Sequence, residues 1–310
     1  MTASSGAQVL VLSGGGVLGA AQAGMLEALE ATGWRPDVIV GVSAGALNGT
    51  AVAADFSATA VVELQRMWKS QPTRGPFPTR TAGQLWRVAR SGSLQDDEPL
   101  RELLASSCPV ADLQETAIPI HVAAIELVTG EARWFSSGPA LEILYASAAI
   151  PGILPPALID GTYYIDGATV ANVPVSYALT FNPSRIVVLD VSVDASKRET
   201  PTTPLAIVLR SLAHARAAVT DYEFATLGEH IDVHHVHYSG PPGLRLQDFG
   251  RTRELIDAGR TAMSAHLEHR PLHPAPGANQ PEPVTLAPSA GRWHLPRLFA
   301  GQKSQVTALS

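Results

Sequence analysis

Two short glycine-rich stretches carry residue types that can do chemistry. The first, SGGGVLG at residues 13–19, follows an apolar, β-branched run and precedes an alanine-rich stretch with helical spacing. Its glycines at 14, 16 and 19 satisfy G-x-G-x-x-G, a pattern that binds the pyrophosphate of dinucleotides. The second, GVSAG at residues 41–45, is a G-x-S-x-G pattern. The first stretch indicates an anion-binding loop, and the second indicates a serine nucleophile.

The dinucleotide interpretation fails at the second predicted strand. A dinucleotide site needs an acidic residue at the end of that strand, where it binds the ribose hydroxyls. Here Asp37 precedes the strand at 38–41 and therefore lies at its wrong end. Where the acid belongs, the strand runs into Gly41 and Ser43, so the sequence favours a different anion for the glycine loop.

The G-x-S-x-G pattern lies between a predicted strand and a predicted helix, which is the context of a nucleophile elbow. Gly41 and Gly45 leave room around the sharp turn. Ser43 then stands at a helix N-terminus, where the helix dipole stabilises a developing alkoxide. Such a nucleophile needs donors for the oxyanion of a tetrahedral intermediate, and glycine-loop amides supply them. Because the carboxyl ends of parallel strands meet at one edge, we expect three such donors beside the serine: Gly14, Gly15 and Gly16.

The partner base has two kinds of candidate. The histidines that follow the serine are His214, His230, His234, His235 and His237, and none has a distinctive setting. The cluster HIDVHHVHY alternates along a predicted strand, which divides its histidines between two faces and disfavours a metal site. Asp166 follows an apolar and aromatic run and precedes Gly167 and Ala168, so its carboxylate lies on a tight turn beside little bulk. The same Asp-Gly pair is also typical of an ordinary turn.

The elements that must position these residues alternate along the chain. Strands rich in Val and Ile are predicted at 8–12, 38–41, 119–127, 186–193 and 231–237. Helices are predicted at 17–31, 44–54, 58–69, 97–106, 205–227 and 252–268. This order indicates an α/β sandwich around a mainly parallel sheet.

Composition limits the class of protein. The chain has 310 residues, of which 45% are hydrophobic and 16% charged, so it can bury a sizeable core. Its net charge of -6 argues against a nucleic-acid partner. A single cysteine, Cys108, excludes an internal disulfide framework. No stretch is typical of a signal peptide or a membrane span, so we expect a cytoplasmic protein with any membrane contact peripheral.

Four blocks, in order along the chain, resemble the patatin-like phospholipase family of lipid acyl hydrolases, in its bacterial type. They are SGGGVLGAAQAGML, GVSAGALNG, ASAAIPGILPP (146–156) and DGATVANVP (166–174). The stretch DFGRTRELIDAGRTAM (248–263) is similar to the closing helix of that family. The resemblance runs from about Val9 to Arg270 and implies a three-layer α/β/α sandwich formed by a domain at 1–270.

The resemblance also implies the chemistry. Ser43 is then the nucleophile, Asp166 the general base, and the glycine-loop amides the oxyanion hole, with no histidine, metal or cofactor. The residues that complete the motifs are Gly19, Gly41, Gly45, Gly167 and Ala168. The expected partner is a lipid ester, namely a phospholipid, a lysophospholipid or an acylglycerol. The sequence does not indicate an oligomeric state.

Two positions depart from the family. Leu18 stands where many relatives carry Arg or Lys, and Ser13 stands where an acidic residue is common. Both changes remove charge from the edge of the expected site, which favours neutral acyl esters as substrates. Leu18 also supports a second hypothesis, a patatin-like scaffold with little catalysis and a regulatory or lipid-binding role.

Two segments are set apart from the sheet by composition. Residues 72–96 are predicted to leave the sheet. Within them, FPTRTAGQLWRVAR (77–90) fits either a flap that contacts a lipid surface or a helix that docks Trp86 into the core. Residues 271–310 are rich in proline and are expected to form a mobile tail. The stretch RWHLPRLF (292–299) in that tail raises the same two alternatives.

Overall fold

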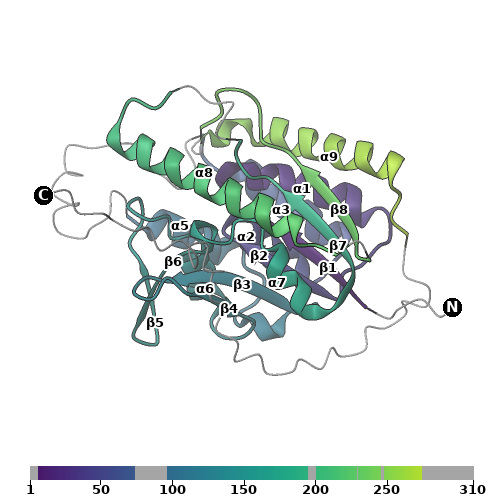
Figure 1. Ribbon diagram of the computed structural model, residues 1–310, viewed down its shortest axis with the longest axis horizontal. Coiled ribbons are helices and arrows are strands. Elements are labelled where there is room, and N and C mark those ends of the chain that lie inside the picture. The colour runs from purple at the N-terminus through teal and green to yellow at the C-terminus, as the bar shows by residue number, and fades with distance from the viewer. Residues whose placement is uncertain (1–5, 74–95, 195–199, 229, 246–247, 274–310) are drawn as a thin grey trace, which may run out of the picture.

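A central sheet organises the chain (Figure 1). The computed structural model describes residues 6–73, 96–194, 200–228, 230–245 and 248–273. The strands are β1 (Ala7–Leu12), β2 (Val38–Val42), β3 (Ile120–Glu126), β4 (Ala132–Phe135), β5 (Ala157–Ile159), β6 (Thr162–Asp166), β7 (Pro183–Asp190) and β8 (Asp232–His237). They lie in the order β5-β6-β3-β2-β1-β7-β8, with β4 also paired to β3.

Helices connect and cover these strands. The described α-helices are α1 (Gly19–Glu30), α2 (Ala44–Ala53), α3 (Ala58–Ser70), α5 (Glu98–Ser107), α6 (Ala140–Ala148), α7 (Val175–Ala178), α8 (Pro204–Ala225) and α9 (Thr252–His269). The described 3₁₀ helices are η1 (Gly16–Leu18), η2 (Leu113–Glu115), η3 (Gly167–Thr169), η4 (Leu179–Phe181) and η6 (Phe249–Arg251).

Five of the strands, β3, β2, β1, β7 and β8, run parallel. The remaining pairings are antiparallel and lie on the β3 side of the sheet. Parallel neighbours need crossover helices, whereas β5 and β6 are joined by a tight turn at Asp160 and Gly161. The sheet therefore changes from parallel to antiparallel pairing at β3.

Alternate residues of each central strand face opposite layers. Leu10 and Leu12 of β1 pack in a large core with the helices α1, α2, α3, α5, α6 and α9. Val9 and Val11 pack on the other face against α7 and the end of α8. Because side chains alternate along a strand, one apolar run fills both cores. The expected sandwich with helices on both faces of a mainly parallel sheet is confirmed.

The five predicted strands correspond to β1, β2, β3, β7 and β8, and the six predicted helices to α1, α2, α3, α5, α8 and α9. The sequence did not predict β4, β5, β6, α6 or α7. These elements are short, spanning three to nine residues, and turn glycines interrupt the pattern between them. Periodicity has too few residues there to distinguish strand from loop.

The packed core extends slightly beyond the expected domain boundary at residue 270. Leu272 is only 3% exposed and lies in the large core. The predicted flap at 77–90 and the tail from residue 274 onward lie outside the described residues.

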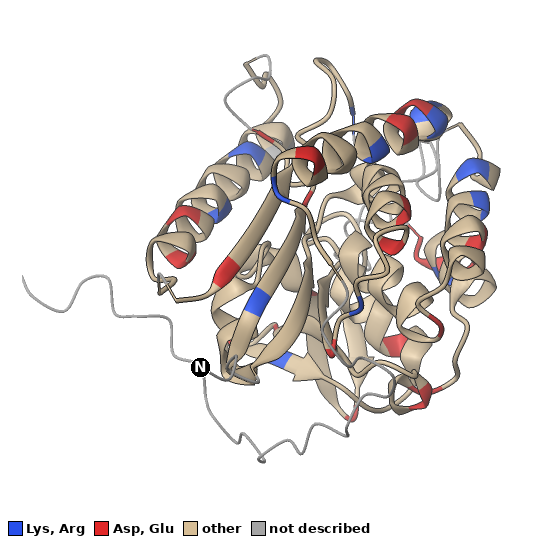
Figure 2. Cartoon of the chain, turned by 90° about the vertical axis from the view of Figure 1, so that its right-hand side faces the viewer, with Lys and Arg blue, Asp and Glu red and all other residues tan. Residues whose placement is uncertain are grey.

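The surface helices carry acidic and basic side chains interspersed, as Figure 2 shows. Among the helices of the described ranges, none combines the length and the apolar character needed to cross a bilayer.

Candidate active site

Ser43 occupies the sharp turn between the end of β2 and the start of α2. Its backbone has φ 54° and ψ -121°, a region that non-glycine residues seldom adopt. Gly41 and Gly45 permit this turn, since a Cβ at Gly41 would lie 2.8 Å from the Gly45 carbonyl oxygen. The turn presents Ser43 at the edge of the sheet. Backbone strain of this kind is typical of a functional site.

Ser147 on α6 supports this turn from the neighbouring layer. The backbone N–H of Ser43 donates a hydrogen bond of 2.9 Å to the hydroxyl oxygen of Ser147, which is fully buried. Ser147 lies in the block ASAAIPG, but the sequence did not predict its role, because nothing in the sequence distinguishes it from other serines.

Asp166 faces Ser43 across the end of the sheet. The Ser43 hydroxyl donates a hydrogen bond of 3.1 Å to Oδ2 of Asp166. The other oxygen, Oδ1, accepts a 2.8 Å hydrogen bond from the N–H of Ala168. Asp166 is 5% exposed and Ser43 is 9% exposed, so the pair is shielded from water. The Asp-Gly turn here also holds a carboxylate against the serine.

Antiparallel pairing brings Asp166 to this position. β6 runs against β3, so its last residue, Asp166, lies opposite Ala124, close to the end of β3. On the other side of β3, Ala123 pairs with Val42, which immediately precedes Ser43. Gly167 follows in η3. It packs so closely on β3 that a Cβ at this position would lie 2.4 Å from the carbonyl oxygen of Ala123.

Burial raises the pKa of the Asp166 carboxyl to about 6. The Ala168 N–H, the positive charge of Arg216 and the Ser43 hydroxyl each act in the opposite direction. A carboxyl with a raised pKa is a stronger base than an ordinary aspartate, and it is still ionised at neutral pH.

Arg216 was not singled out by the sequence, where it is one arginine among many. It extends from α8 toward η3, and its Nη1 lies 3.5 Å from the carbonyl oxygen of Ala168. Burial lowers the pKa of its guanidinium, and the Asp166 carboxylate offsets part of that effect. Arg216 thus places a positive charge close enough to stabilise the ionised Asp166 carboxylate.

The glycine loop lies beside the serine, and its three amides differ. The N–H of Gly14 donates to the carbonyl of Asn172 at 3.1 Å, so the expectation for this amide needs correction: it is already bonded. Within the described part of the chain, the N–H groups of Gly15 and Gly16 have no such backbone acceptor. Gly16 has φ 57° and lines a cavity together with Ser43. Gly19 begins α1 just beyond the loop.

Leu18 does not lie at the edge of the site, contrary to expectation. Its side chain is fully buried in the large core, and it contacts the backbone at Gly240, near Leu244. Ser13 is also fully buried, and its hydroxyl accepts a 2.8 Å hydrogen bond from the N–H of Val191. Ser13 thus ties the loop to the residue after β7, and Leu18 packs it against the segment that follows β8.

A small apolar cavity of about 60 Å³ opens at Ser43. Leu47 of α2 and Trp68 of α3 form part of its wall, and α5 contributes Leu100, Leu103 and Leu104. The indole N–H of Trp68 donates to Asn48 at 2.9 Å, which fixes the ring against α2. The nucleophile therefore faces an apolar space between α2, α3 and α5, which Ala148 of α6 and Phe249 of η6 also line.

The histidines of β8 are divided between two faces, as predicted. His234 is 3% exposed and shares a 3.0 Å hydrogen bond with His266. His235 faces the other way and pairs with Asp190 at 3.0 Å. Within the described ranges, no three His, Cys, Asp or Glu side chains are grouped so that they could hold a metal ion. Asp37 accepts a hydrogen bond from the N–H of Gln8, at the end of the sheet where β1 and β2 begin.

Comparison with known proteins matches the chain to one family. The family model described as patatin-like phospholipase matches residues 10–179. An uncharacterised NTE family protein of Mycobacterium bovis is 30% identical over 175 residues, which are 56% of this chain and 46% of that protein. The neuropathy target esterase of Drosophila melanogaster is 25% identical over 184 residues, 59% of this chain and 13% of that protein.

A lysophospholipase of Emericella nidulans is 27% identical over 187 residues, which are 59% of this chain and 12% of that protein. The match with each of these relatives thus spans less than half of the relative's length.

Proposed function

The chain belongs to the patatin-like phospholipase family, and from this premise we propose that it is a serine acyl hydrolase that cleaves carboxylic esters of lipids. The observation that carries the proposal is the buried hydrogen bond between Ser43 and Asp166, beside the glycine loop and an apolar cavity. A nucleophile within hydrogen-bond reach of a base is the minimum that acyl transfer requires.

In the first half of the proposed reaction, the Ser43 hydroxyl oxygen attacks the ester carbonyl carbon and its proton passes to Oδ2 of Asp166. The N–H groups of Gly15 and Gly16 stabilise the oxyanion that forms. The bond between the carbonyl carbon and the alcohol oxygen then breaks, and Asp166 gives its proton to the leaving alcohol. The product of this half is an acyl ester of Ser43.

In the second half, water attacks the acyl carbon and gives its proton to Asp166. The bond to the Ser43 oxygen breaks, the serine takes the proton back, and a fatty acid leaves. Arg216 stabilises the charged form of Asp166 between these transfers, because its positive charge opposes the effect of burial.

We propose lysophospholipids and other single-chain lipid esters as the substrates to test first. One relative is named a lysophospholipase, and the cavity at Ser43 is small and apolar. A panel of phosphatidylcholine, lysophosphatidylcholine and monoacylglycerol, assayed with purified protein, ranks these classes directly.

A fluorophosphonate probe separates this proposal from a catalytically weak scaffold that binds or regulates lipids. The probe forms a covalent bond with an activated serine, so wild type should be labelled and Ser43→Ala should not. Asp166→Ala should lose both labelling and ester hydrolysis. Folded wild-type protein that resists the probe would favour the scaffold instead.

The proposal includes peripheral contact with a lipid surface through α8. Its outward face carries Ile207, Val208 and Tyr222, each about half exposed. Exposed apolar side chains on a surface helix are typical of an interfacial contact. In liposome sedimentation, the double variant Ile207→Asp, Val208→Asp should bind less than wild type. The double variant Ser264→Asp, Ala265→Asp adds the same charge at exposed positions of α9 and serves as the control.

A further inference from the structure

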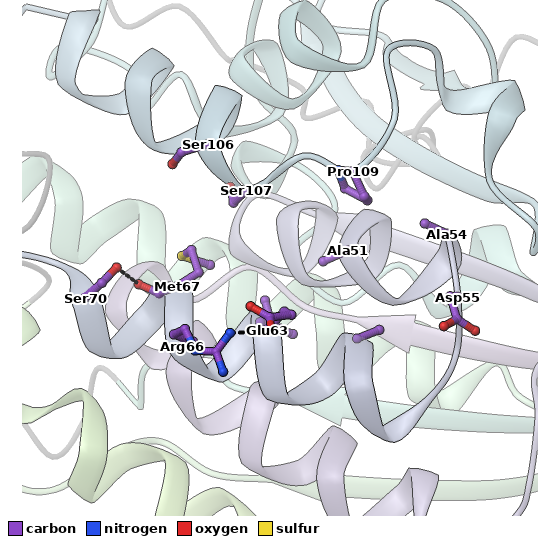
Figure 3. A pocket seen from close by; sticks show the side chains of 12 residues that line it. Ala51, Ala54, Asp55, Glu63, Arg66, Met67, Ser70, Ser106, Ser107 and Pro109 are labelled. Atoms are coloured by element: carbon purple, nitrogen blue, oxygen red, sulfur yellow. Dashed lines mark hydrogen bonds and ion pairs between the residues drawn. The ribbon is translucent and has the colours of Figure 1, made fainter.

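A second cavity, of about 490 Å³, lies beside the C-terminal end of α2 (Figure 3). Each charged or hydroxyl side chain that lines it already has a partner within the protein. These side chains are Asp55, Glu63, Arg66, Ser70, Ser106 and Ser107. Figure 3 shows, for example, the hydrogen bond from the Ser70 hydroxyl to the Met67 carbonyl. The polar lining of this cavity therefore does not point to a ligand.

A buried amide near Ser43 differs in this respect. The described part of the chain buries four side-chain amides, those of Gln22, Asn48, Gln65 and Asn172. The first three each donate and accept hydrogen bonds within the protein. Within the described ranges, the carboxamide of Asn172 has no hydrogen-bond partner, although the residue is only 9% exposed. Because burial of an unpartnered amide is unfavourable, such a group indicates a place for a ligand atom.

Asn172 lies beside the nucleophile. A Cβ placed on Gly14 would lie 2.8 Å from Oδ1 of Asn172 and 3.3 Å from the Cβ of Ser43. The Cβ of Ala168, in the turn that holds Asp166, would lie 3.0 Å away. The carboxamide and the nucleophile therefore meet on one side of Gly14, where the glycine has no side chain to separate them.

The backbone of Asn172 is fixed to the glycine loop. Its carbonyl accepts the 3.1 Å hydrogen bond from the N–H of Gly14. The preceding residue, Ala171, donates to the Gly167 carbonyl at 3.1 Å, and the following residue, Val173, is fully buried. Only the side-chain torsions of Asn172 are left to vary. A half turn about the last of them exchanges Oδ1 with Nδ2, so the amide can present an N–H group beside Gly14.

We propose that Asn172 is a further catalytic residue, whose side-chain N–H donates to the oxyanion together with the N–H groups of Gly15 and Gly16. This inference rests on the proposed function. The carboxamide takes the role that the sequence suggested for the Gly14 N–H, which is bonded to the Asn172 carbonyl instead. A donor without a partner breaks no hydrogen bond when the ester arrives, and a donor that is already in place stabilises the charge that develops in the transition state.

Steady-state kinetics on a soluble monomeric ester give the first test. Asn172→Ala should lower kcat by about a hundredfold and change KM by less than about twofold, because an oxyanion donor acts mainly in the transition state. Asn172→Leu keeps the branched shape but also lacks the donor, and it replaces Asn172→Ala if that variant fails to fold. An unchanged kcat in either folded variant would overturn the proposal.

Thermal melts separate a catalytic donor from a structural amide. Gln65→Ala is the matched control, because Gln65 is a buried amide of α3 that donates to Glu27 and lines neither cavity. It should lower the melting temperature by roughly 2 °C or more and leave kcat unchanged. Asn172→Ala breaks no hydrogen bond of its side chain, so it should lower the melting temperature less than Gln65→Ala does. A larger loss of stability with an unchanged kcat would assign Asn172 a structural role only.

A dodecyl trifluoromethyl ketone provides a readout that a structural role would not move. The Ser43 oxygen adds to its carbonyl carbon, the serine proton passes to Asp166, and the carbonyl oxygen becomes an anion with no leaving group. Its affinity should fall about as much as kcat in Asn172→Ala, whereas the affinity of the matching methyl ketone should change by less than about twofold. A constant ratio of the two inhibition constants would overturn the donor.

Binding of laurate distinguishes failure of the donor from failure of the proposed function. By calorimetry, the double variant Ser43→Ala, Asn172→Ala should bind this carboxylate about tenfold more weakly than Ser43→Ala, since a charge-assisted hydrogen bond is lost. If a fluorophosphonate does not label folded wild type while Asn172→Ala still weakens laurate binding, the proposed hydrolase fails and the donor stands. If labelling fails and the two variants bind laurate equally, the donor is rejected as well.

Discussion

The backbone N–H of Ser43 donates a 2.9 Å hydrogen bond to the hydroxyl oxygen of Ser147, a residue 104 positions later in the chain. Ser147 is fully buried on α6. This contact fixes the N–H side of the strained turn, from which the Ser43 side chain reaches Asp166.

Replacement of Ser147 by Ala should leave the Ser43 N–H buried without an acceptor. We expect a loss of roughly 1–3 kcal/mol in the free energy of unfolding, and a fall in ester hydrolysis of roughly tenfold to a hundredfold, since small shifts of a nucleophile are costly. Chemical denaturation and steady-state kinetics measure the two effects. Ser211→Ala on α8, whose hydroxyl donates to the Ile207 carbonyl of the same helix, should change neither.

The pH dependence of hydrolysis should report the Asp166 carboxyl, whose pKa burial raises to about 6. The proposed base works only when ionised, so kcat/KM should fall as the pH drops through about 6. Arg216→Met removes a charge that lowers this pKa, and its acid limb should therefore move to higher pH. Arg210→Met on the same helix is the comparison. An acid limb that Arg216→Met leaves in place would contradict the role given to Arg216.

Replacement of Asp166 by Asn should abolish hydrolysis and stabilise the fold at neutral pH. The carboxyl has a pKa of about 6 in the folded protein against its usual 3.8, so between these values the folded state binds more protons than the unfolded state. The stability of wild type therefore falls as the pH rises through this window, by up to roughly 3 kcal/mol. The Asn variant lacks this loss.

Melting temperatures measured across pH check this. The difference in favour of Asp166→Asn should be largest above pH 6 and should vanish below about pH 4. A constant difference at every pH would show that the charge of Asp166 is not its cause.

Two replacements of Ser43 should separate backbone strain from chemistry. Both Ser43→Ala and Ser43→Gly remove the nucleophile, but only glycine adopts φ 54° and ψ -121° without strain. We expect Ser43→Gly to be the more stable of the two by roughly 1 kcal/mol or more, the usual size of such strain. Thermal or chemical unfolding of the two inactive variants decides this, and equal stabilities would mean that the turn is not strained.

Introduction of a basic residue at position 18 should destabilise the protein rather than improve catalysis. Leu18 is fully buried among apolar neighbours, so Leu18→Arg places a charge without a partner in the core, at a cost of roughly 3–5 kcal/mol. Leu18→Met keeps the volume and should cost less than about 1.5 kcal/mol. Unfolding curves measure both. Higher lipid hydrolysis by a stably folded Leu18→Arg would instead support the weak scaffold.

The sequence by itself determined the features that are local. The apolar run before Ser43 and the small residues after it required a strand, a sharp turn and a helix. Alternating strands and helices required a mainly parallel sheet, whose geometry places the loops after neighbouring strands at the same edge. Asp166 was recognised because its turn and the following motif are also local.

Only the tertiary structure decided which groups meet. Asp166 reaches Ser43 because a short antiparallel strand, which periodicity did not predict, returns beside β3. The roles of Ser147 and Arg216 depend on contacts across 104 and 48 positions of the chain, and their residue types alone do not reveal them. The hydrogen bond from the Gly14 N–H to the Asn172 carbonyl likewise joins residues that are far apart in the chain. Hydrogen-bond partners and burial depend on distances in space, and these are set only when the layers pack.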